Sequence, residues 1–353
     1  MLHRGPFTRF DNDSTRRWFE ERGVPLKTEK DGRVFPKSDQ SSSIVGVLQQ
    51  EAARLNVRVS TGWRVKGLQA DEAGFHLSAQ HPEGVAELRA THVLLASGSD
   101  RKAWALCEQL GHRIVPPVPS LFTFPAPEDA DLRALQGLSC PTALKLRVQA
   151  SASGKAQTFT DAGPLLFTHW GVSGPAVIRM SSWAARAMAQ AGYQAALTCD
   201  FAEGVPTSAI EAELLALKKG GGPRDRVGAV LPPAIRGRVP RRLWHALVLR
   251  AGIDANQQLY RETRDASLRQ VAARVKATVV AVAGRTAYKE EFVTAGGVDL
   301  RDVDMRTMES RLVPRLHFAG EALNVDGETG GYNFQNAWTT AWLAAQGIAR
   351  EIG

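Results

Sequence analysis

The sequence predicts an α/β protein in which one sheet domain is interrupted by a second domain. Two near-continuous apolar runs, Thr91–Ala96 and Arg315–Ala319, are typical of buried strands in a parallel sheet, and a helical pattern follows each of them. Between these runs, prolines cluster from Pro116 onward, which indicates a connecting segment. Near Gly284 the pattern of the first part of the chain returns. We therefore expect the two runs to belong to one sheet that an insert separates in the sequence.

The 353 residues, of which 44% are hydrophobic, are enough for roughly two domains of the usual size. We assign residues 1–115 and 285–353 to one discontinuous sheet domain. Residues 116–284 form the predicted insert, in which a β part precedes a helical part.

Composition argues against several classes of protein. No apolar run approaches the roughly 18 residues of a membrane-spanning helix, and residues 1–10 lack the apolar core of a signal peptide. We therefore expect a cytoplasmic protein with no membrane partner. The three cysteines lie far apart and form no C-x-x-C pair, which argues against a zinc cluster or a redox-active dithiol, and we predict no metal site. The net charge of +8 would suit nucleic acid, an anionic cofactor or an acidic substrate.

The sheet domain begins with two predicted helices. Asn12 or Asp13 can cap the first helix, which Gly23 ends. The second helix follows the serines at 41–43, carries an apolar stripe and leads into a predicted strand at Val57–Val59. A helix followed by a strand is typical of a parallel sheet.

A small antiparallel meander is expected next. Three short strand patterns, Trp63–Leu68, Phe75–Ala79 and Val85–Leu88, are separated by turn-forming residues. The apolar run at 91–96 then returns to the main sheet as a strand buried on both faces. A helix is predicted after it at Ala103–Leu110.

The insert combines both kinds of pattern. Ala143–Val148 alternates like a strand, whereas Ser173–Ala191 and Arg241–Val282 have helical patterns, with a glycine break at 220–222 between them. Beyond the insert, Glu291–Thr294 is a predicted strand. The simplest interpretation is a mixed domain inside the sheet domain.

A long helix, Phe334–Ile352, ends the chain. Its apolar residues recur at helical spacing, and we expect them to form the buried side: Phe334, Trp338, Ala341, Trp342, Ala345, Ile348 and Ala349. We interpret these aromatic side chains as core and not as a cofactor-binding surface.

The strongest chemical signal lies between the last predicted strand and this helix. Gly320 allows close approach at the carboxyl end of a strand, and Glu321 can accept hydrogen bonds from sugar or ribityl hydroxyls. Gly330 and Gly331 let the backbone approach something planar, and the helix start offers free N–H groups to the carbonyl edge of a flavin ring. An ordinary glycine-containing strand-to-helix turn accounts for the same residues equally well.

Three segments carry a resemblance to a known family. They are GRVFPKSDQ at Gly32–Gln40, LFTHWGVSGPAVI at Leu166–Ile178, and the long segment Thr294–Trp338 that contains HFAGEALNVDGETGGYNFQNAW. With them, the chain resembles the BaiN/RdsA-type flavoproteins, which are bacterial NAD(P)/FAD-dependent oxidoreductases. The resemblance covers essentially the whole chain.

The resemblance implies a glutathione-reductase-like FAD-binding domain, incomplete at its N-terminus, and an insert that is first β-barrel-like and then helical. It implies FAD as cofactor and NADH or NADPH as reductant. Glu321, Asn333 and Phe334 match family positions that contact FAD, and the backbone of Val65 would lie against the adenine. Further residues of the same motif are implied as neighbours of the cofactor: Gly320, Asp326, Gly330, Gly331, Tyr332 and Gln335.

The chain departs from the family pattern in two places. The G-x-G-x-x-G turn that would bind the FAD pyrophosphate is absent, and Met1 falls well inside the family pattern, so we expect a late start, a truncation or a different phosphate site. After the run at 91–96, the family has an A-T-G-G motif, where this chain has Ala96–Ser99. We expect a shorter loop over the cofactor.

Two further groups of residues have competing interpretations. His169 could exchange the proton that accompanies hydride transfer, but we favour a histidine that hydrogen-bonds its own loop. An arginine cluster could bind nucleic acid, but we favour a solvated helical face and loop: Arg236, Arg238, Arg241, Arg242 and Arg250.

The function we predict is that of an FAD-dependent oxidoreductase that passes hydride from a reduced nicotinamide to a small organic acceptor. The alternative is a truncated flavoprotein remnant that does not hold FAD and is inactive or only a binding protein. A nucleic-acid binder ranks last, so we expect a small-molecule substrate and no nucleic-acid partner. The absence of a C-x-x-C pair excludes the disulfide-reductase variant of the fold.

Overall fold

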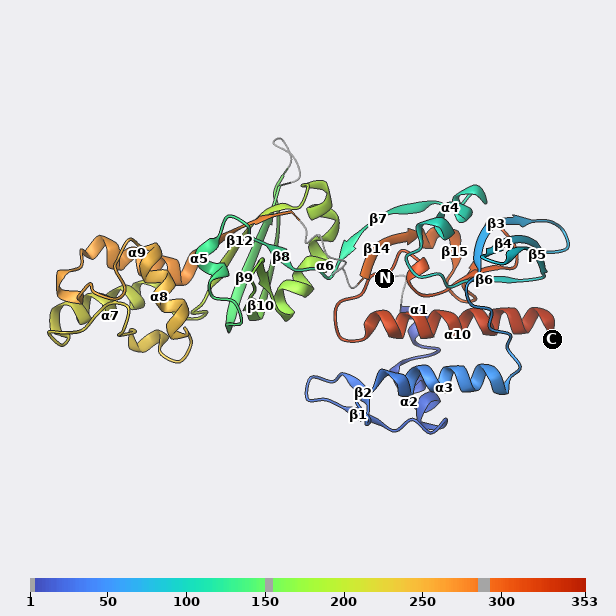
Figure 1. Cartoon of the computed structure of the whole chain (residues 1–353), viewed down its shortest axis with the longest axis horizontal. Helices are drawn as coiled ribbons and strands as arrows, with labels where there is room; N and C mark the ends of the chain where they lie inside the picture. Colours follow the sequence, from blue (N-terminus) through green and yellow to red (C-terminus); the bar gives the residue numbers. More distant parts are fainter. Residues whose placement is uncertain (1–3, 150–154, 285–292) are drawn as a thin grey trace. The chain divides into compact units, whose positions relative to one another are not determined.

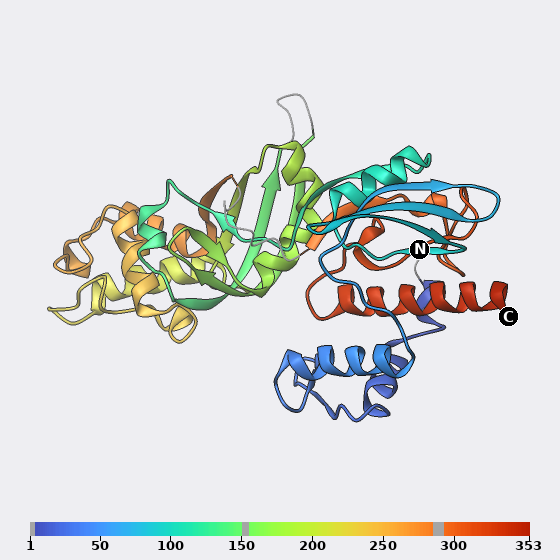
Figure 2. The same ribbon diagram turned by 45° about the vertical axis from the view of Figure 1, so that its right-hand side comes forward.

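The computed structural model describes residues 4–149, 155–284 and 293–353. The chain forms two compact units, of which unit 1 is Met1–Val118 with Val293–Gly353 and unit 2 is Pro119–Phe292. Both units mix helices and strands, as the α/β class predicts (Figures 1 and 2). Each unit has its own hydrophobic core.

The N-terminal part of unit 1 is a small layer of helices around a hairpin. Its elements are α1 (Arg4–Phe7), α2 (Asn12–Glu20), β1 (Leu26–Thr28), β2 (Val34–Pro36) and α3 (Ser41–Arg54). Both predicted helices are present, but the cap of α2 is Asp11, whose side chain accepts a hydrogen bond from the Ser14 N–H at 2.8 Å. The prediction of Asn12 or Asp13 was wrong by one or two residues, because both already lie inside the helix.

The predicted strand at Val57–Val59 does not form. These residues follow α3 without regular structure, and Val57 and Val59 are 55% and 70% exposed. A strand needs a neighbour that takes its backbone hydrogen bonds, and no strand of the described residues pairs with this segment. The local apolar pattern was therefore not sufficient for a strand.

The meander and the strand after it follow in the predicted order. β3 (Arg64–Ala70), β4 (Phe75–His81) and β5 (Gly84–Ala90) pair as antiparallel neighbours. β6 (Val93–Leu95) and α4 (Arg101–Gln109) come next. However, β6 is short and not buried on both faces, because it is the end strand of its sheet and Leu94 is 38% exposed.

A four-stranded sheet joins the two ends of unit 1. Its order is β15 (Val303–Asp304), β16 (Glu309–Ser310), β17 (Leu316–Phe318) and β6, with β17 and β6 parallel. The predicted strand at 315–319 is thus confirmed, and its three strand residues are all buried. Short 3-10 turns lie before β15 (η3, Leu300–Asp302) and after β17 (η4, Gly320–Ala322).

The proline-rich connection predicted from Pro116 is a strand over part of its length. β7 (Ile114–Ser120) contains Pro116, Pro117 and Pro119 and pairs with β14 (Val293–Val298) in a two-stranded ladder. Edge strands tolerate proline because one side of the strand needs no backbone donor. The predicted strand Glu291–Thr294 overlaps β14, although Glu291 and Phe292 lie outside the described residues.

The C-terminal helix α10 (Tyr332–Ile352) forms as predicted, but its most buried residues are not the predicted ones. It lies between the strands of unit 1 and the N-terminal layer with α2 and α3 (Figures 1 and 2). Its buried residues are Asn336, Thr339, Thr340, Leu343, Ala344 and Gly347. Phe334, predicted to be core, is 69% exposed and stacks on Trp338.

The physical reason is that α10 packs close to the backbone of other segments of unit 1. The Thr339 hydroxyl donates to the Phe10 carbonyl at 2.8 Å, and a Cβ added to Gly347 would lie 3.0 Å from the Thr307 carbonyl oxygen. Small and hydroxyl-bearing residues permit this approach, whereas large apolar residues would hold the helix away. The predicted apolar stripe is thus only partly buried: Trp338 and Trp342 pack against hydrophobic clusters of unit 1, whereas Phe334 is exposed.

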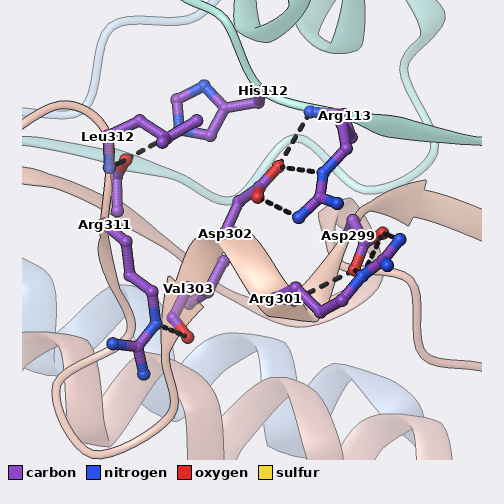
Figure 3. Close-up of polar contacts among 9 residues, drawn as sticks. His112, Arg113, Asp299, Arg301, Asp302, Val303, Arg311 and Leu312 are labelled. Carbon is purple, nitrogen blue, oxygen red and sulfur yellow. Dashed lines mark hydrogen bonds and ion pairs between the residues drawn. The ribbon is translucent and has the colours of Figure 1, made fainter.

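Ion pairs fix the start of β7 against the turn before β15 (Figure 3). The Asp302 carboxylate accepts hydrogen bonds from the Arg113 backbone N–H at 2.9 Å and from Arg113 Nε at 3.3 Å. Asp299 pairs with Arg301 on the same turn. The Asp302 side chain is only 6% exposed, so this pair joins the two halves of unit 1 across a buried carboxylate.

Unit 2 has a curled antiparallel sheet with helices. The strand order is β13-β12-β9-β10-β11-β8, and the end strands β13 and β8 contact each other, which nearly closes a barrel. The strands are β8 (Phe124–Pro125), β9 (Ser139–Val148), β10 (Gln157–Phe167), β11 (Gly171–Ser173), β12 (Gln194–Asp200) and β13 (Thr278–Ala283). This agrees with a β-barrel-like part.

The helical part of unit 2 lies mostly between β12 and β13. Its helices and turns are α5 (Ala130–Arg133), α6 (Pro175–Gln190), α7 (Thr207–Gly220), η1 (Pro233–Ile235), α8 (Arg241–Arg250), η2 (Tyr260–Glu262) and α9 (Asp265–Ala277). Two details were wrong: Ser173 is in β11, with Gly174 as the cap of α6, and residues 278–282 form a strand. The β-branched run at 278–280 explains the second, since it pairs with β12.

Candidate functional site

The candidate site begins where the parallel strands β6 and β17 end. Their carboxyl ends meet at one sheet edge, which brings Gly98 beside Glu321. A Cβ added to Gly98, whose φ is +62°, would lie 4.0 Å from Glu321 Oε2. The other carboxylate oxygen, Oε1, accepts a hydrogen bond from the Thr294 N–H at 2.8 Å. Glu321 is therefore held by β14, and its second oxygen faces a glycine.

Gly320 fixes α10 below this carboxylate. Its N–H donates to the Thr340 hydroxyl at 2.9 Å, and that hydroxyl donates to the Asn336 carbonyl at 2.6 Å. A Cβ at Gly320 would lie 3.4 Å from the Ala337 Cβ, so the turn and the helix are close. The φ of +66° at Gly320 is also one that side chains rarely adopt.

Asn333 and Gln335, two predicted cofactor residues, already have partners in the protein. Asn333 Oδ1 accepts from the Gly327 N–H at 2.7 Å, and its Nδ2 donates to the Gly327 carbonyl at 3.0 Å. Gln335 Nε2 donates to the Thr15 and Thr339 hydroxyls, both at 3.0 Å. Asn333 thus orders the loop before α10, and Gln335 ties the start of α10 to α2.

The start of α10 is open. Gly331, at φ +90°, precedes the helix, and no side chain among the described residues caps it. The first N–H groups of a helix carry partial positive charge and favour an anion or a carbonyl oxygen. Tyr332 and Phe334 are 62% and 69% exposed beside these groups. Such an arrangement suits a planar ligand with an electron-rich edge.

The predicted cofactor residues are thus mostly neighbours in the structure. All of them except Val65 lie in the turn, loop and helix start at 320–335 of unit 1. Val65 lies on β3, is 41% exposed, and stands where the pairing with β4 shifts register. Its contact with an adenine stays a prediction.

Sequence reasoning missed one feature of unit 1. A cavity of about 270 Å³ lies between the β1–β2 hairpin and the start of α3. It is lined by Arg22, Gly23, Val24, Pro25, Pro36, Ser38, Ser42, Ser43, Gly46, Val47 and Gln50. The serine cluster at 41–43 was visible in the sequence, but only the fold brings it next to Arg22.

His169 and the arginine cluster belong to unit 2. His169 is exposed between β10 and β11, edge-on to Trp170 at a centroid distance of 4.2 Å. Its role as a proton donor is untested. In the cluster, Arg242 donates to the Ala134 carbonyl at 3.1 Å, and Arg250 pairs with Asp129 at 3.1 Å. These bonds give at least part of the cluster a role in the fold.

The cysteines are buried and free of disulfides. Burial raises the pKa of the Cys107 thiol to about 12, and it also raises the pKa of Cys140 and Cys199. A thiol is nucleophilic only as thiolate, so none of the three is suited to attack a substrate. Separately, no helix within the described residues has the length and hydrophobicity needed to cross a membrane.

Comparison with known proteins gives matches along almost the whole chain. The family model described as HI0933-like protein Rossmann domain matches residues 2–347. A 3-dehydro-bile acid delta(4,6)-reductase of Clostridium scindens is 27% identical over 98% of this chain and 82% of its own length.

Two further relatives have a different name. The ribosomal RNA dihydrouridine synthase of Escherichia coli is 29% identical over 92% of this chain and 76% of its own length. The enzyme of the same name from Haemophilus influenzae is 28% identical over 92% of this chain and 72% of its own length. The resemblance identified from the three sequence segments is thus confirmed, while the exclusion of nucleic acid as a partner is left open.

Proposed function

We propose that this chain, which belongs to the HI0933-like Rossmann family of flavin-type oxidoreductases, binds FAD and reduces a carbon–carbon double bond conjugated with a carbonyl group. The observation that carries the proposal is the combination at the end of β17. There, one oxygen of Glu321 is anchored and the other faces Gly98, while no side chain in the described part of the chain caps the start of α10.

These residues fit a flavin cofactor by their chemistry. The Glu321 carboxylate would accept hydrogen bonds from the hydroxyls of the ribityl or ribose part, and the N–H groups at the start of α10 would hold the carbonyl edge of the ring. Asn333 would keep the intervening loop in place through Gly327. When bound, FAD supplies a ring that accepts hydride from a reduced nicotinamide and delivers it to carbon.

The names of the relatives support the class of acceptor. A delta(4,6)-reductase and a dihydrouridine synthase both add hydrogen across a ring double bond, in a bile acid and in a uridine respectively. In a 3-dehydro bile acid with a delta-4 bond, as in uracil, that bond is conjugated with a carbonyl group. We propose the same reaction class here, with NADH or NADPH as the reductant.

A second candidate acceptor is uridine within RNA. Two of the relatives carry that substrate in their names, and the net charge of +8 favours a polyanion. The bonds of Arg242 and Arg250 within the fold weigh against this cluster as the RNA-binding surface. Among the candidate acceptors, we therefore rank a small molecule with a double bond conjugated to a carbonyl group first, and uridine in RNA second.

The visible absorption spectrum of the purified chain tests cofactor binding first. We expect the protein to show a flavin absorption band after it has been mixed with FAD and then desalted. A colourless protein would instead support a remnant that does not retain FAD. If the band is retained, NADH and NADPH are offered with a 3-keto-4-ene steroid acid or with a uridine-containing RNA. If the nicotinamide is oxidised no faster with either acceptor than without it, the proposed reaction is overturned.

A further inference from the structure

We propose that His92, His317 and Glu351 form a binding site for a divalent transition-metal ion, with Zn²⁺ the best match. One ligand atom from each residue lies within 4.8 Å of the other two. The residues come from separate parts of unit 1, since His92 precedes β6, His317 is the middle residue of β17 and Glu351 is in the last turn of α10. Only the fold brings these parts together.

The state of His317 points to a ligand. Its side chain is fully buried, and its Nδ1 lies 3.2 Å from the Thr307 carbonyl oxygen. A carbonyl only accepts hydrogen bonds, so Nδ1 carries the proton, and in the neutral imidazole Nε2 presents its lone pair. Within the described residues, this buried Nε2 has no hydrogen-bond partner. A buried polar atom without a partner is costly, and a metal ion bound to Nε2 removes that cost.

The same contact to Thr307 is what metal-binding histidines usually have. A ligating imidazole donates its other N–H to a carbonyl or carboxylate, which sets both the tautomer and the ring orientation. The rings of His92 and His317 lie 6.0 Å apart between centroids, with their planes 29° from parallel. The contact to Thr307 therefore fixes the His317 ring, and the His92 ring lies next to it.

His92 and Glu351 supply the other two donor atoms. His92 Nε2 and Glu351 Oε2 are 2.8 Å apart and share a hydrogen bond. A metal would replace the proton between them, which needs a neutral imidazole and a free carboxylate. In a tetrahedral zinc site, neighbouring ligand atoms are about 3.3 Å apart, so small side-chain movements suffice. Glu351 is exposed and can make them.

The donor set narrows the choice of metal. Two imidazole nitrogens and one carboxylate oxygen suit Zn²⁺ and its neighbours in the transition series, whereas Mg²⁺ and Ca²⁺ prefer oxygen alone. Three protein ligands leave one position for water. Because α10 rises about 1.5 Å per residue, Glu351 lies roughly 28 Å along the helix from Tyr332. We therefore assign the ion to holding the end of α10 against β17 and β6, independently of the proposed catalysis.

The test uses the full chain without an affinity tag, stripped of metal by a chelator. We expect one equivalent of Zn²⁺ to bind in calorimetry and one equivalent of Co²⁺ to give the visible bands of a low-coordinate histidine site. His92→Ala and Glu351→Gln should each weaken the affinity for Zn²⁺ by more than about tenfold. Even the loss of a residue that only hydrogen-bonds a metal ligand typically weakens metal affinity by about that factor. Glu351 is exposed and His92 is only partly buried, whereas His317 is fully buried, so these variants should fold.

Matched controls come from the meander. His76→Ala removes a histidine that also pairs with a carboxylate at 2.7 Å, and Glu83→Gln removes an exposed carboxylate. Both control variants should bind Zn²⁺ like the parent protein. Failure of the parent chain to bind a stoichiometric ion, or equal affinity in the site variants and the controls, would overturn the proposal.

Discussion

At the scale of single residues, two carboxylates of unit 1 that pair with arginines link the stability of the fold to pH. Arg113 hydrogen-bonds Asp302 and thereby lowers the pKa of its carboxyl group, and Arg301 lowers the pKa of Asp299 to about 2. A carboxylate whose pKa is lower in the folded than in the unfolded state stabilises the fold above its unfolded pKa of about 3.9. That contribution is lost as the pH falls toward the folded pKa.

Asp302→Asn should therefore lower the free energy of unfolding at pH 7 by about 2 kcal/mol, because the buried acceptor of three Arg113 hydrogen bonds loses its charge. The variant should also lose less stability than the parent between pH 5 and pH 2, roughly the range of these carboxyl groups. Urea unfolding at several pH values measures both effects. An unchanged pH dependence would show that the Asp302 carboxylate does not contribute to it.

Glu321 is the residue on which cofactor binding should depend most. Replacing it by alanine removes a charged acceptor worth about 1.5–3 kcal/mol, which corresponds to a roughly 10–150-fold weaker affinity for FAD. Glu83→Ala, which removes a carboxylate that is 89% exposed in the meander, is the matched control. Fluorescence quenching of FAD during titration gives both dissociation constants. Equal constants would remove Glu321 from the FAD site.

At the scale of elements, α10 shows how local pattern and tertiary packing differ. The 3.6-residue periodicity predicted the helix correctly, because the pattern depends only on neighbouring residues. The choice of buried side depended on what faces the helix. There, the Phe10 carbonyl and the Gly320 N–H need hydroxyl partners, so Thr339 and Thr340 are buried and Phe334 is exposed.

Thr340→Val tests this packing with almost no change in volume. The substitution leaves the buried Gly320 N–H without its acceptor, which should cost about 1–3 kcal/mol of the free energy of unfolding. The same exchange at Thr158, an exposed residue of β10, should change stability by less than about 0.5 kcal/mol. Chemical denaturation compares the two variants. Similar losses at both positions would argue against a structural role for the Thr340 hydroxyl.

Strands were harder to predict than helices for a related reason. The meander was predicted correctly because its three strands pair with their neighbours in sequence. The strand at 57–59 failed, and β6 is less buried than expected, because each depends on a partner distant in sequence. β7 was missed because prolines indicate a connection unless a partner such as β14 is known.

At the scale of the whole molecule, two compact units have separate cores of unequal size. The core of unit 2 contains many more fully buried residues than that of unit 1. Both cores contain cysteine: Cys107 lies in the core of unit 1, and Cys140 and Cys199 lie in the core of unit 2. Thiol chemistry can therefore follow the opening of each unit.

We expect none of the three thiols to react with a thiol-specific reagent in the folded chain, because all are buried and their pKa values are raised. In increasing urea, Cys107 should be labelled at a lower concentration than Cys140 and Cys199, because the smaller core opens first. Mass spectrometry of labelled peptides identifies each site. Labelling of Cys199 before Cys107 would contradict the expected order.

The sequence by itself determined the α/β class, most helices, the meander and the family, because these depend on periodicity and on contiguous motifs such as residues 320–335. Only the tertiary structure decided which side of α10 is buried and that Glu321 Oε2 faces Gly98. It also brought His92, His317 and Glu351 together, although more than 200 residues separate the first two in sequence. Such contacts depend on the pairing of β6 with β17 and on where α10 packs, and neither leaves a signal in local sequence.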